Sequence, residues 1–339
     1  MQRPSELRER LLQPVLDLLW CQWTAMGVAG ARVCDGVIID PEALLLSTLD
    51  IGRSDARLFD EALDWVSVNA GHLDMSRMRR LGKSGTTEQQ TLLGVVADIA
   101  IEHGAKSSLG QLSEAGFLAR EESAGYGLKP LFVSSTRTES DWAGRDERFA
   151  HAGFARSPLQ LRAMSRPPQA TLPACIRFRA RALFGVGARA EVIAYLWCHE
   201  WAHGRLIAER SAYNQAPVAE YLTVLADANL VDKRVEGRRT LYRLTEGLRE
   251  AGGQVPTYVD WVRVWPALVA ILQALELDDD SDDAAWLRLV RALEAQREAL
   301  AAEGLDVHVP DLNGWARSGA QVLERTLDKV IARVEALVV

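Results

Sequence analysis

The chain has 339 residues, of which 48% are hydrophobic and 25% charged, and a net charge of −7, which is typical of a folded protein of two or three domains. No secretory signal follows Met1, and no apolar run reaches the roughly 18–20 residues that cross a bilayer, so we expect a cytoplasmic protein without membrane contact. The four cysteines form no CxxC pair, which argues against a disulfide framework and against a cysteine-rich zinc site.

Residues 1–120 are predicted to form a helical N-terminal domain, because apolar side chains recur there at helical spacing. Asp40 followed by Pro41 is a strong helix start, with an aspartate cap and a proline at the first helical position. Thr86 begins another predicted helix, which runs toward His103.

Between residues 121 and 172 the helical periodicity fades. This segment contains clusters of Ser, Gly and Pro, such as Ser165-Arg166-Pro167-Pro168, and we expect a linker or docking arm. A helix over residues 176–184 is expected to support the domain that follows.

Residues 173–246 carry the most informative pattern of the chain. Three helices and then two short strands are predicted, over residues 191–200, 205–211, 215–230, 231–235 and 240–244. This order is that of a winged helix-turn-helix, which typically places its third helix in the major groove of DNA. Residues 175–245 carry eleven basic and seven acidic side chains, whereas residues 246–339 carry nine and seventeen. Positive charge is therefore concentrated where it could attract phosphate.

The third helix is predicted to read bases. We expect Asn214 to cap it and Pro217 to lie in its first turn. Apolar residues at positions i, i+4 and i+7 dock the helix on the other two, which leaves an outer face of Asn214, Gln215, Ala216, Ala219, Glu220 and Thr223. Amide side chains on this face can pair with adenine, and an alanine methyl can pack on thymine.

The hairpin after the third helix is predicted to contact the DNA backbone. Val231, Val235, Leu241 and Leu244 are expected to fill one of its faces, and Gly237 to supply the tight turn. The residues predicted to contact DNA from the second helix and the hairpin are Arg205, Arg210, Arg234, Arg238, Arg239 and Thr240.

Residues 185–245 resemble the ArsR-like family of bacterial winged-helix transcriptional regulators. The resemblance rests on the third helix and on the hairpin pattern Leu230-Val231-x-Lys233-Arg234-x-x-Gly237-Arg238-Arg239-x-x-Tyr242-x-Leu244. It implies a dimeric repressor or activator with the third helix in the major groove. The chain departs from the family at Glu220 and Tyr221, where a basic residue and a histidine are common. It also lacks the family's metal-sensing cysteine pair, so no metal cofactor is implied.

Residues 247–339 are predicted to form a helical C-terminal domain. Three helices are expected there, over residues 258–277, 284–303 and 315–339. An acidic loop at residues 278–283 separates the first two. Trp261 and Trp265 stand four residues apart and are expected in the core, the alternative being a ligand pocket that some tryptophans line.

A competing motif is His199-Glu200-Trp201-Ala202-His203, which matches the HExxH pattern of zinc metallopeptidases. On a helix, the two histidines would hold zinc and Glu200 would act as general base. The motif falls where the first two helices of the winged fold meet, Gly204 is expected to end a helix there, and no third ligand stands at a recognisable spacing. Zinc binding by His199 and His203 is therefore kept as an alternative.

The sequence thus predicts a mostly α-helical protein in which a central winged helix-turn-helix is flanked by helical N- and C-terminal domains. The predicted function is that of a transcriptional regulator, most simply a repressor, which binds specific double-stranded DNA as a homodimer and is not an enzyme. The first and the C-terminal helices are the expected dimer surfaces. The alternatives are a zinc metallopeptidase and a winged helix used for protein contacts. The flanking domains could sense an unknown small-molecule or protein effector.

Overall fold

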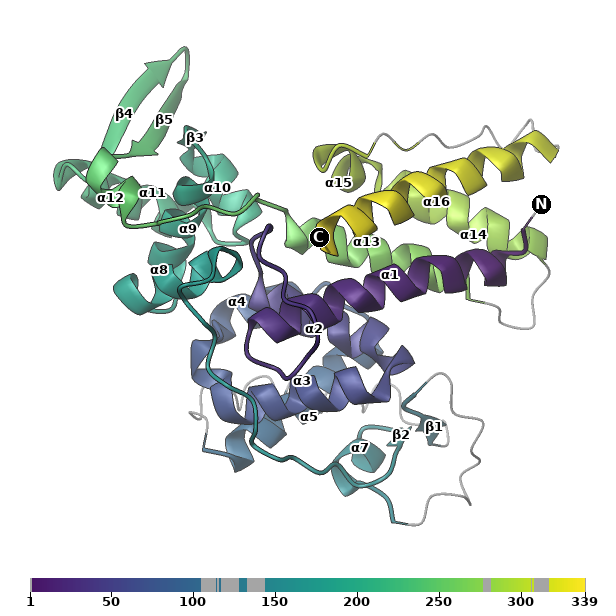
Figure 1. Cartoon of the computed structure of the whole chain (residues 1–339). Helices are drawn as coiled ribbons and strands as arrows, with labels where there is room; N and C mark the ends of the chain where they lie inside the picture. The colour runs from purple at the N-terminus through teal and green to yellow at the C-terminus, as the bar shows by residue number, and fades with distance from the viewer. Residues whose placement is uncertain are drawn as a thin grey trace.

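Helices dominate the fold, as the sequence predicts, and the strands among the described residues form two small sheets. The computed structural model describes residues 2–104, 114, 116, 128–132, 144–276, 282–305, 307 and 317–338. Helices from both ends of the chain lie side by side, while one β-hairpin projects away from the rest of the molecule (Figure 1). None of the helices in these ranges is both long and apolar enough to cross a membrane.

The N-terminal part forms a helical bundle whose helices begin at capping residues. Its elements are α1 (Pro4–Ala25), α2 (Pro41–Ile51), η1 (Gly52–Ser54), α3 (Ala56–Asn69), η2 (Ala70–His72), α4 (Met75–Gly82) and α5 (Thr87–Glu102). The Asp40 carboxylate accepts a hydrogen bond from the Ala43 amide at 3.1 Å, and Pro41 is the first residue of α2. The Thr86 hydroxyl caps α5 in the same way. Both predicted helix starts are confirmed, and most of the predicted domain beyond α5 lies outside the described residues.

The predicted docking arm packs against α3. Its described elements are β1 (Lys129–Pro130), α7 (Glu147–His151) and β2 (Phe154–Ala155), and η5 (Pro173–Cys175) follows directly after it. β1 and β2 form a short parallel pair that the sequence did not predict. The Asp64 carboxylate accepts hydrogen bonds from the consecutive amides of residues 162–165 at 2.7–3.2 Å. Arg156 adds an ion pair with Asp60 at 2.7 Å, and these contacts hold the arm on α3.

The middle of the chain combines helices with an antiparallel sheet of strand order β3-β5-β4. Its elements are α8 (Ile176–Phe184), α9 (Ala188–Cys198), β3 (Ala202–His203), α10 (Gly204–Arg210), α11 (Gln215–Asp227), β4 (Val231–Glu236), β5 (Arg239–Leu244) and α12 (Glu246–Glu250). The predicted supporting helix coincides with α8, and the predicted ends of the other helices and strands lie within three residues of those observed. β3 and α12 were not predicted. We refer to residues 188–244 as the α9–β5 unit.

The C-terminal helices pack along α1. They are α13 (Trp261–Ala274), α14 (Asp282–Ala295), α15 (Arg297–Ala302) and α16 (Arg317–Val338). The prediction of a single helix over residues 284–303 is wrong, because the helix is interrupted at Gln296, which separates α14 from α15. Most of the predicted acidic loop lies outside the described residues. Trp261 and Trp265 are buried and stack with ring centroids 5.1 Å apart, so their predicted place in the core is confirmed.

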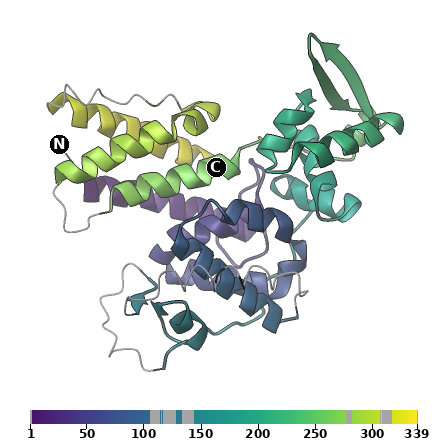
Figure 2. The same ribbon diagram turned by 180° about the vertical axis from the view of Figure 1, so that it is seen from behind.

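The described residues bury two hydrophobic cores. The larger one joins α1–α5 to α13–α16, so both ends of the chain contribute to it (Figure 2). The smaller one lies inside the α9–β5 unit and α8, and it also takes in Ile38 from the segment before α2. The apolar faces of α1 and α16 are buried against each other within the same chain.

A single disulfide, which the sequence did not predict, joins Cys21 of α1 to Cys34 in the loop that follows, with Cα atoms 5.0 Å apart. Their spacing along the chain gives no sign of it because the pairing depends on how the loop folds back on α1. Cys175 and Cys198 are free thiols, and burial raises the pKa of each to about 12. The chain therefore has one cross-link among these cysteines rather than a framework.

Candidate nucleic-acid interface

The α9–β5 unit is held together by apolar residues at the predicted helical spacings. Val192, Ile193 and Leu196 of α9 are buried, and so are Val218, Leu222 and Leu225 of α11. They form one core with Ile207 of α10 and with Val231 and Leu244 at the base of the hairpin. Packing of these stripes leaves the opposite face of α11 exposed to solvent.

The HExxH segment is not helical, so the interpretation of this segment as a zinc-binding helix is wrong. His199 has an extended backbone (φ −132°, ψ 139°) and so does His203 (φ −95°, ψ 148°). The His203 ring accepts a hydrogen bond from the Leu206 amide at 3.0 Å and thereby caps α10, which begins at Gly204 instead of ending there. The His199 ring stacks on Tyr195 at 4.0 Å between centroids. Two histidines four residues apart come close enough to share a metal ion when they lie on adjacent turns of one helix, and here no helix runs from His199 to His203.

The predicted base-reading residues lie on the exposed face of α11. Asn214, Gln215, Ala216 and Glu220 are all exposed. Asn214 occupies the N-cap position of α11, as predicted, but its side chain makes no capping hydrogen bond. Its amide is therefore not consumed within the helix start. Tyr221 is half-buried.

The hairpin β4–β5 carries a cationic tip. Glu236 pairs with Arg239, and Gly237 takes a positive φ of 60° in the two-residue turn between them, as the predicted tight turn requires. Arg238 and Arg239 are exposed, and neither forms an ion pair with any residue that the structure describes. The hairpin projects away from the body in both views (Figures 1 and 2).

The prediction that four apolar residues fill one face of the hairpin is only partly correct. Val231 lies opposite Leu244, and both are buried. Leu241 lies opposite Arg234 and therefore on the other face of the sheet, because directly opposite residues of antiparallel strands share a side. Val235 is 73% exposed, since the strands extend beyond the core at that point.

Trp201, which sequence reasoning missed, supports the base of the hairpin. The guanidinium groups of Arg234 and Arg243 lie 4.4 and 4.9 Å from its ring centroid. Arg243 also forms an ion pair with Asp232 at 2.8 Å, and Arg234 one with Glu236 at 2.7 Å. The arginines at the base thus have protein partners, in contrast to those at the tip. No local sequence signal marks Trp201, because its contacts depend on the strand register.

The two predicted arginines of α10 differ. Arg205 is exposed on the surface of the α9–β5 unit. Arg210 instead forms an ion pair with Asp260 at 2.5 Å, and its side chain is 20% exposed. This contact departs from the expectation that Arg210 is free for phosphate, and it arises because the segment before α13 passes next to the end of α10. Thr240 is partly exposed on β5.

A buried ion cluster (Asp40, Glu42, Arg77, Arg177, Arg181 and Glu191) fixes the α9–β5 unit on the N-terminal bundle. Its side chains are at most 4% exposed and carry three positive and three negative charges. Arg77 of α4 donates to Asp40 at 2.6 Å and to Glu42 at 2.7 Å. Its Nε donates to the carbonyl of Ser211, directly after α10, at 2.8 Å. The charges of α2 and α4 are thus paired with those of α8 and α9.

The charges in this cluster change the pKa values of the carboxyl groups. Burial alone would raise the pKa of Asp40, but the nearby guanidinium groups of Arg177 and Arg77 outweigh it and hold the pKa well below its usual range. Burial is likewise outweighed at Glu42 by Arg181 and Arg77, so the pKa of Glu42 is also lowered. Both carboxyl groups are therefore ionised at neutral pH.

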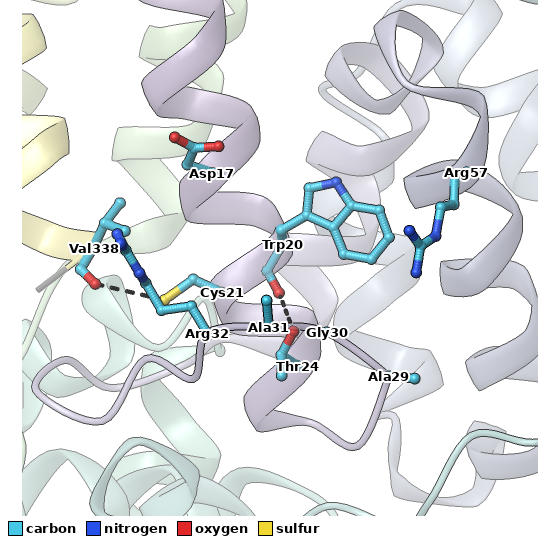
Figure 3. A pocket seen from close by; sticks show the side chains of 10 residues that line it. All are labelled: Asp17, Trp20, Cys21, Thr24, Ala29, Gly30, Ala31, Arg32, Arg57 and Val338. Carbon is cyan, nitrogen blue, oxygen red and sulfur yellow. Dashed lines mark hydrogen bonds between the residues drawn. The ribbon is translucent and has the colours of Figure 1, made fainter.

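A cavity of about 640 Å³ lies beside the C-terminal half of α1 (Figure 3). Its walls include Trp20, Arg32 and Arg57, and Ala29, Gly30 and Ala31 at its rim are exposed. The Trp20 indole donates to Asp55 at 2.8 Å, and the Arg57 guanidinium lies 5.2 Å from the Trp20 ring. Trp20 and Arg57, two of the residues that line this open cavity, thus already make contacts within the protein.

Comparisons with protein-family models, with curated proteins and with solved structures found no match for this chain.

Proposed function

We propose that the chain is a transcriptional regulator that binds specific double-stranded DNA through a winged helix formed by the α9–β5 unit. The proposal is supported by the element order of three helices followed by a hairpin, with β3 adding the third strand in the order β3-β5-β4. The observation that carries it is that the outer face of α11 and the arginine pair at the hairpin tip are both exposed. A helix face with amide side chains suits base edges, and arginines suit phosphates.

In this proposal α11 enters the major groove and Gln215 contacts a base. Arg205, Arg238 and Arg239 hold phosphates on either side of the groove. The protein acts as a homodimer, in line with the ArsR-like resemblance, and its half-sites lie about one helical turn apart. Repression is the simplest mode, because a bound dimer occludes the operator.

Selection of bound duplexes from a random pool tests this function directly. We expect enrichment of a defined sequence with two related half-sites. Absence of enrichment over the starting pool, with protein shown to be folded, would overturn the proposal. A single unrepeated site would retain DNA binding but overturn the homodimer.

Replacing Gln215 with alanine is expected to cost about 1–3 kcal/mol of binding free energy on the selected duplex and little on a random duplex. The physical reason is that a bidentate amide–base contact exists only on the correct base. Fluorescence anisotropy titrations with both duplexes measure the difference. Gln321→Ala, an exposed glutamine on α16, is the matched control and should change neither affinity. Equal losses on the two duplexes would refute base reading by Gln215.

A second candidate is a winged helix used for protein contacts. It is favoured by the exposed face of α11, which carries Glu220 and Asp227 but no basic residue, and by Val224, which is 55% exposed there. Such a surface would suit a partner with basic and apolar residues. In that case Val224→Asp would abolish capture of the partner, whereas the duplex selection would return no sequence.

A further inference from the structure

A second cavity lies in the N-terminal bundle, between α2, α13 and the turn that joins α4 to α5. Its volume is about 310 Å³, and most of its wall is apolar, with Leu46, Leu81, Val262 and Pro266 among the lining residues. This size lies at the lower end of the range for small-molecule sites. The cavity lies beside the larger core, which contains its lining residues Ala43 and Leu46, and none of its lining residues belongs to the proposed DNA-binding face.

Arg80 of α4 is a partly buried residue that lines this cavity, and two of its donors have no partner. Its Nε and Nη2 atoms are buried and make no hydrogen bond with any described residue. A buried guanidinium group with unpaired donors is costly, and a carboxylate is the group that satisfies two of them at once. The unpaired donors therefore indicate an anionic group that the chain itself does not supply.

Several other polar groups of the cavity are already hydrogen-bonded within the protein. The Ser47 hydroxyl donates to the Ala43 carbonyl at 2.8 Å, and Gln89 donates to the Leu46 carbonyl at 3.1 Å. Asp50 is the acidic residue of the lining, and it accepts a hydrogen bond from Gln89. Burial raises the pKa of Asp50 to about 6, which reduces its charge in mildly acidic solution.

We propose that this cavity binds a small monocarboxylate with an apolar body, and that the carboxylate pairs with Arg80. The apolar walls remove the body of the molecule from water, and the guanidinium group fixes the orientation of its charged end. A volume of about 310 Å³ suits a compact molecule better than a long chain.

The same arginine also touches the segment that leads to α11. The Arg80 guanidinium lies 4.4 Å from the ring centroid of Tyr213, and the Tyr213 hydroxyl donates to Asp74 at the start of α4. Tyr213 directly precedes Asn214, the N-cap of α11. A carboxylate that draws Arg80 away from the Tyr213 ring would change the support of α11. This regulatory step rests on the proposed DNA-binding function, whereas the binding step does not.

Calorimetric titration of the full chain with phenylacetate and with its neutral amide, phenylacetamide, tests the binding step. We expect a dissociation constant of about 1 mM or lower for phenylacetate. The amide should bind at least about tenfold more weakly, because it cannot form the charged pair. Saturable binding that is equal for the two compounds, or none for phenylacetate, would overturn the site.

Substitutions in and near the cavity test whether phenylacetate binds there. Arg80→Met should weaken phenylacetate binding at least about tenfold. Arg79→Met, at the exposed neighbouring position of α4, is the matched control and should leave it unchanged. Ala270→Phe fills the cavity and should abolish phenylacetate binding while Arg80 remains. This variant therefore tests the location of the site even if Arg80→Met does not fold. Undiminished binding by Ala270→Phe would show that the compound binds elsewhere.

The regulatory step is tested with the selected duplex. Saturating phenylacetate should change the affinity for DNA, and saturating DNA should change the affinity for phenylacetate by the same factor, because coupling is reciprocal. Tyr213→Leu should still bind phenylacetate but lose the coupling. Phenylacetate binding without any DNA binding would overturn the proposed function and leave the site intact. DNA binding that phenylacetate does not alter would overturn the coupling alone.

Discussion

Replacing Arg77 with methionine is expected to destabilise the protein by about 3–5 kcal/mol, the cost of breaking a buried ion pair. The substitution leaves Asp40 and Glu42 with fewer positive partners at sites that are almost fully buried. It also removes the hydrogen bond to the Ser211 carbonyl. Urea denaturation followed by circular dichroism measures the free energy of unfolding.

The matched control is Arg291→Met on α14, where the arginine is exposed and outside the buried ion cluster. That substitution should change the stability by less than about 0.5 kcal/mol. A similar small change for Arg77→Met would mean that the buried ion cluster contributes little to the folded state.

The same cluster predicts an acid dependence of stability. Since the pKa values of Asp40 and Glu42 are lowered in the folded chain, their contribution is fully present above the pKa of the unfolded chain, which is about 4. It is lost as the pH falls further through the folded-state values. In Arg77→Met both folded pKa values move toward those of the unfolded chain, so the loss of stability below pH of about 4 should be shallower.

Replacing Arg238 and Arg239 together with alanine is expected to weaken binding to every duplex and to flatten the salt dependence. Each lost phosphate contact lowers the slope of log K against log salt concentration by about 0.9, so the slope should fall by about 2. The loss should be the same on selected and random DNA, because phosphate contacts carry no sequence information. Anisotropy titrations at several salt concentrations measure it.

The control for this experiment is the double variant Arg291→Ala with Arg297→Ala, which removes the same charge from exposed positions of α14 and α15. Its slope should stay that of the unaltered protein. If the hairpin variant also keeps the original slope, the hairpin tip does not contact DNA.

Local signals in the sequence were sufficient to predict the helices and strands of the α9–β5 unit. Pro217 is suited only to the first turn of a helix, and Gly237 supplies a backbone conformation that other residues rarely adopt. Asn229 likewise takes a positive φ of 54° after α11, in the conformation that asparagine tolerates. Each of these signals acts within a few residues, so the chain itself reveals them.

Contacts between distant residues could not be predicted in this way. Arg77 and Ser211 are 134 positions apart, and Arg210 and Asp260 are 50 apart. Asp40 was recognised as a helix cap, but nothing near it in the sequence indicates that it also binds two arginines. The exposed arginine tip was predicted because exposure there follows from the turn, whereas the pairing of Arg210 depends on the path of the chain after the hairpin.

The place of the buried ion cluster limits how the chain can be divided. A fragment of residues 173–246 would keep Arg177, Arg181 and Glu191 but lose Asp40, Glu42 and Arg77, together with Ile38 from its hydrophobic core. Two guanidinium groups would then share one carboxylate on a newly solvated surface. Unlike a domain joined by a linker, this segment depends on the remainder of the polypeptide, so excision should yield a poorly folded peptide and intact protein should melt in one cooperative transition.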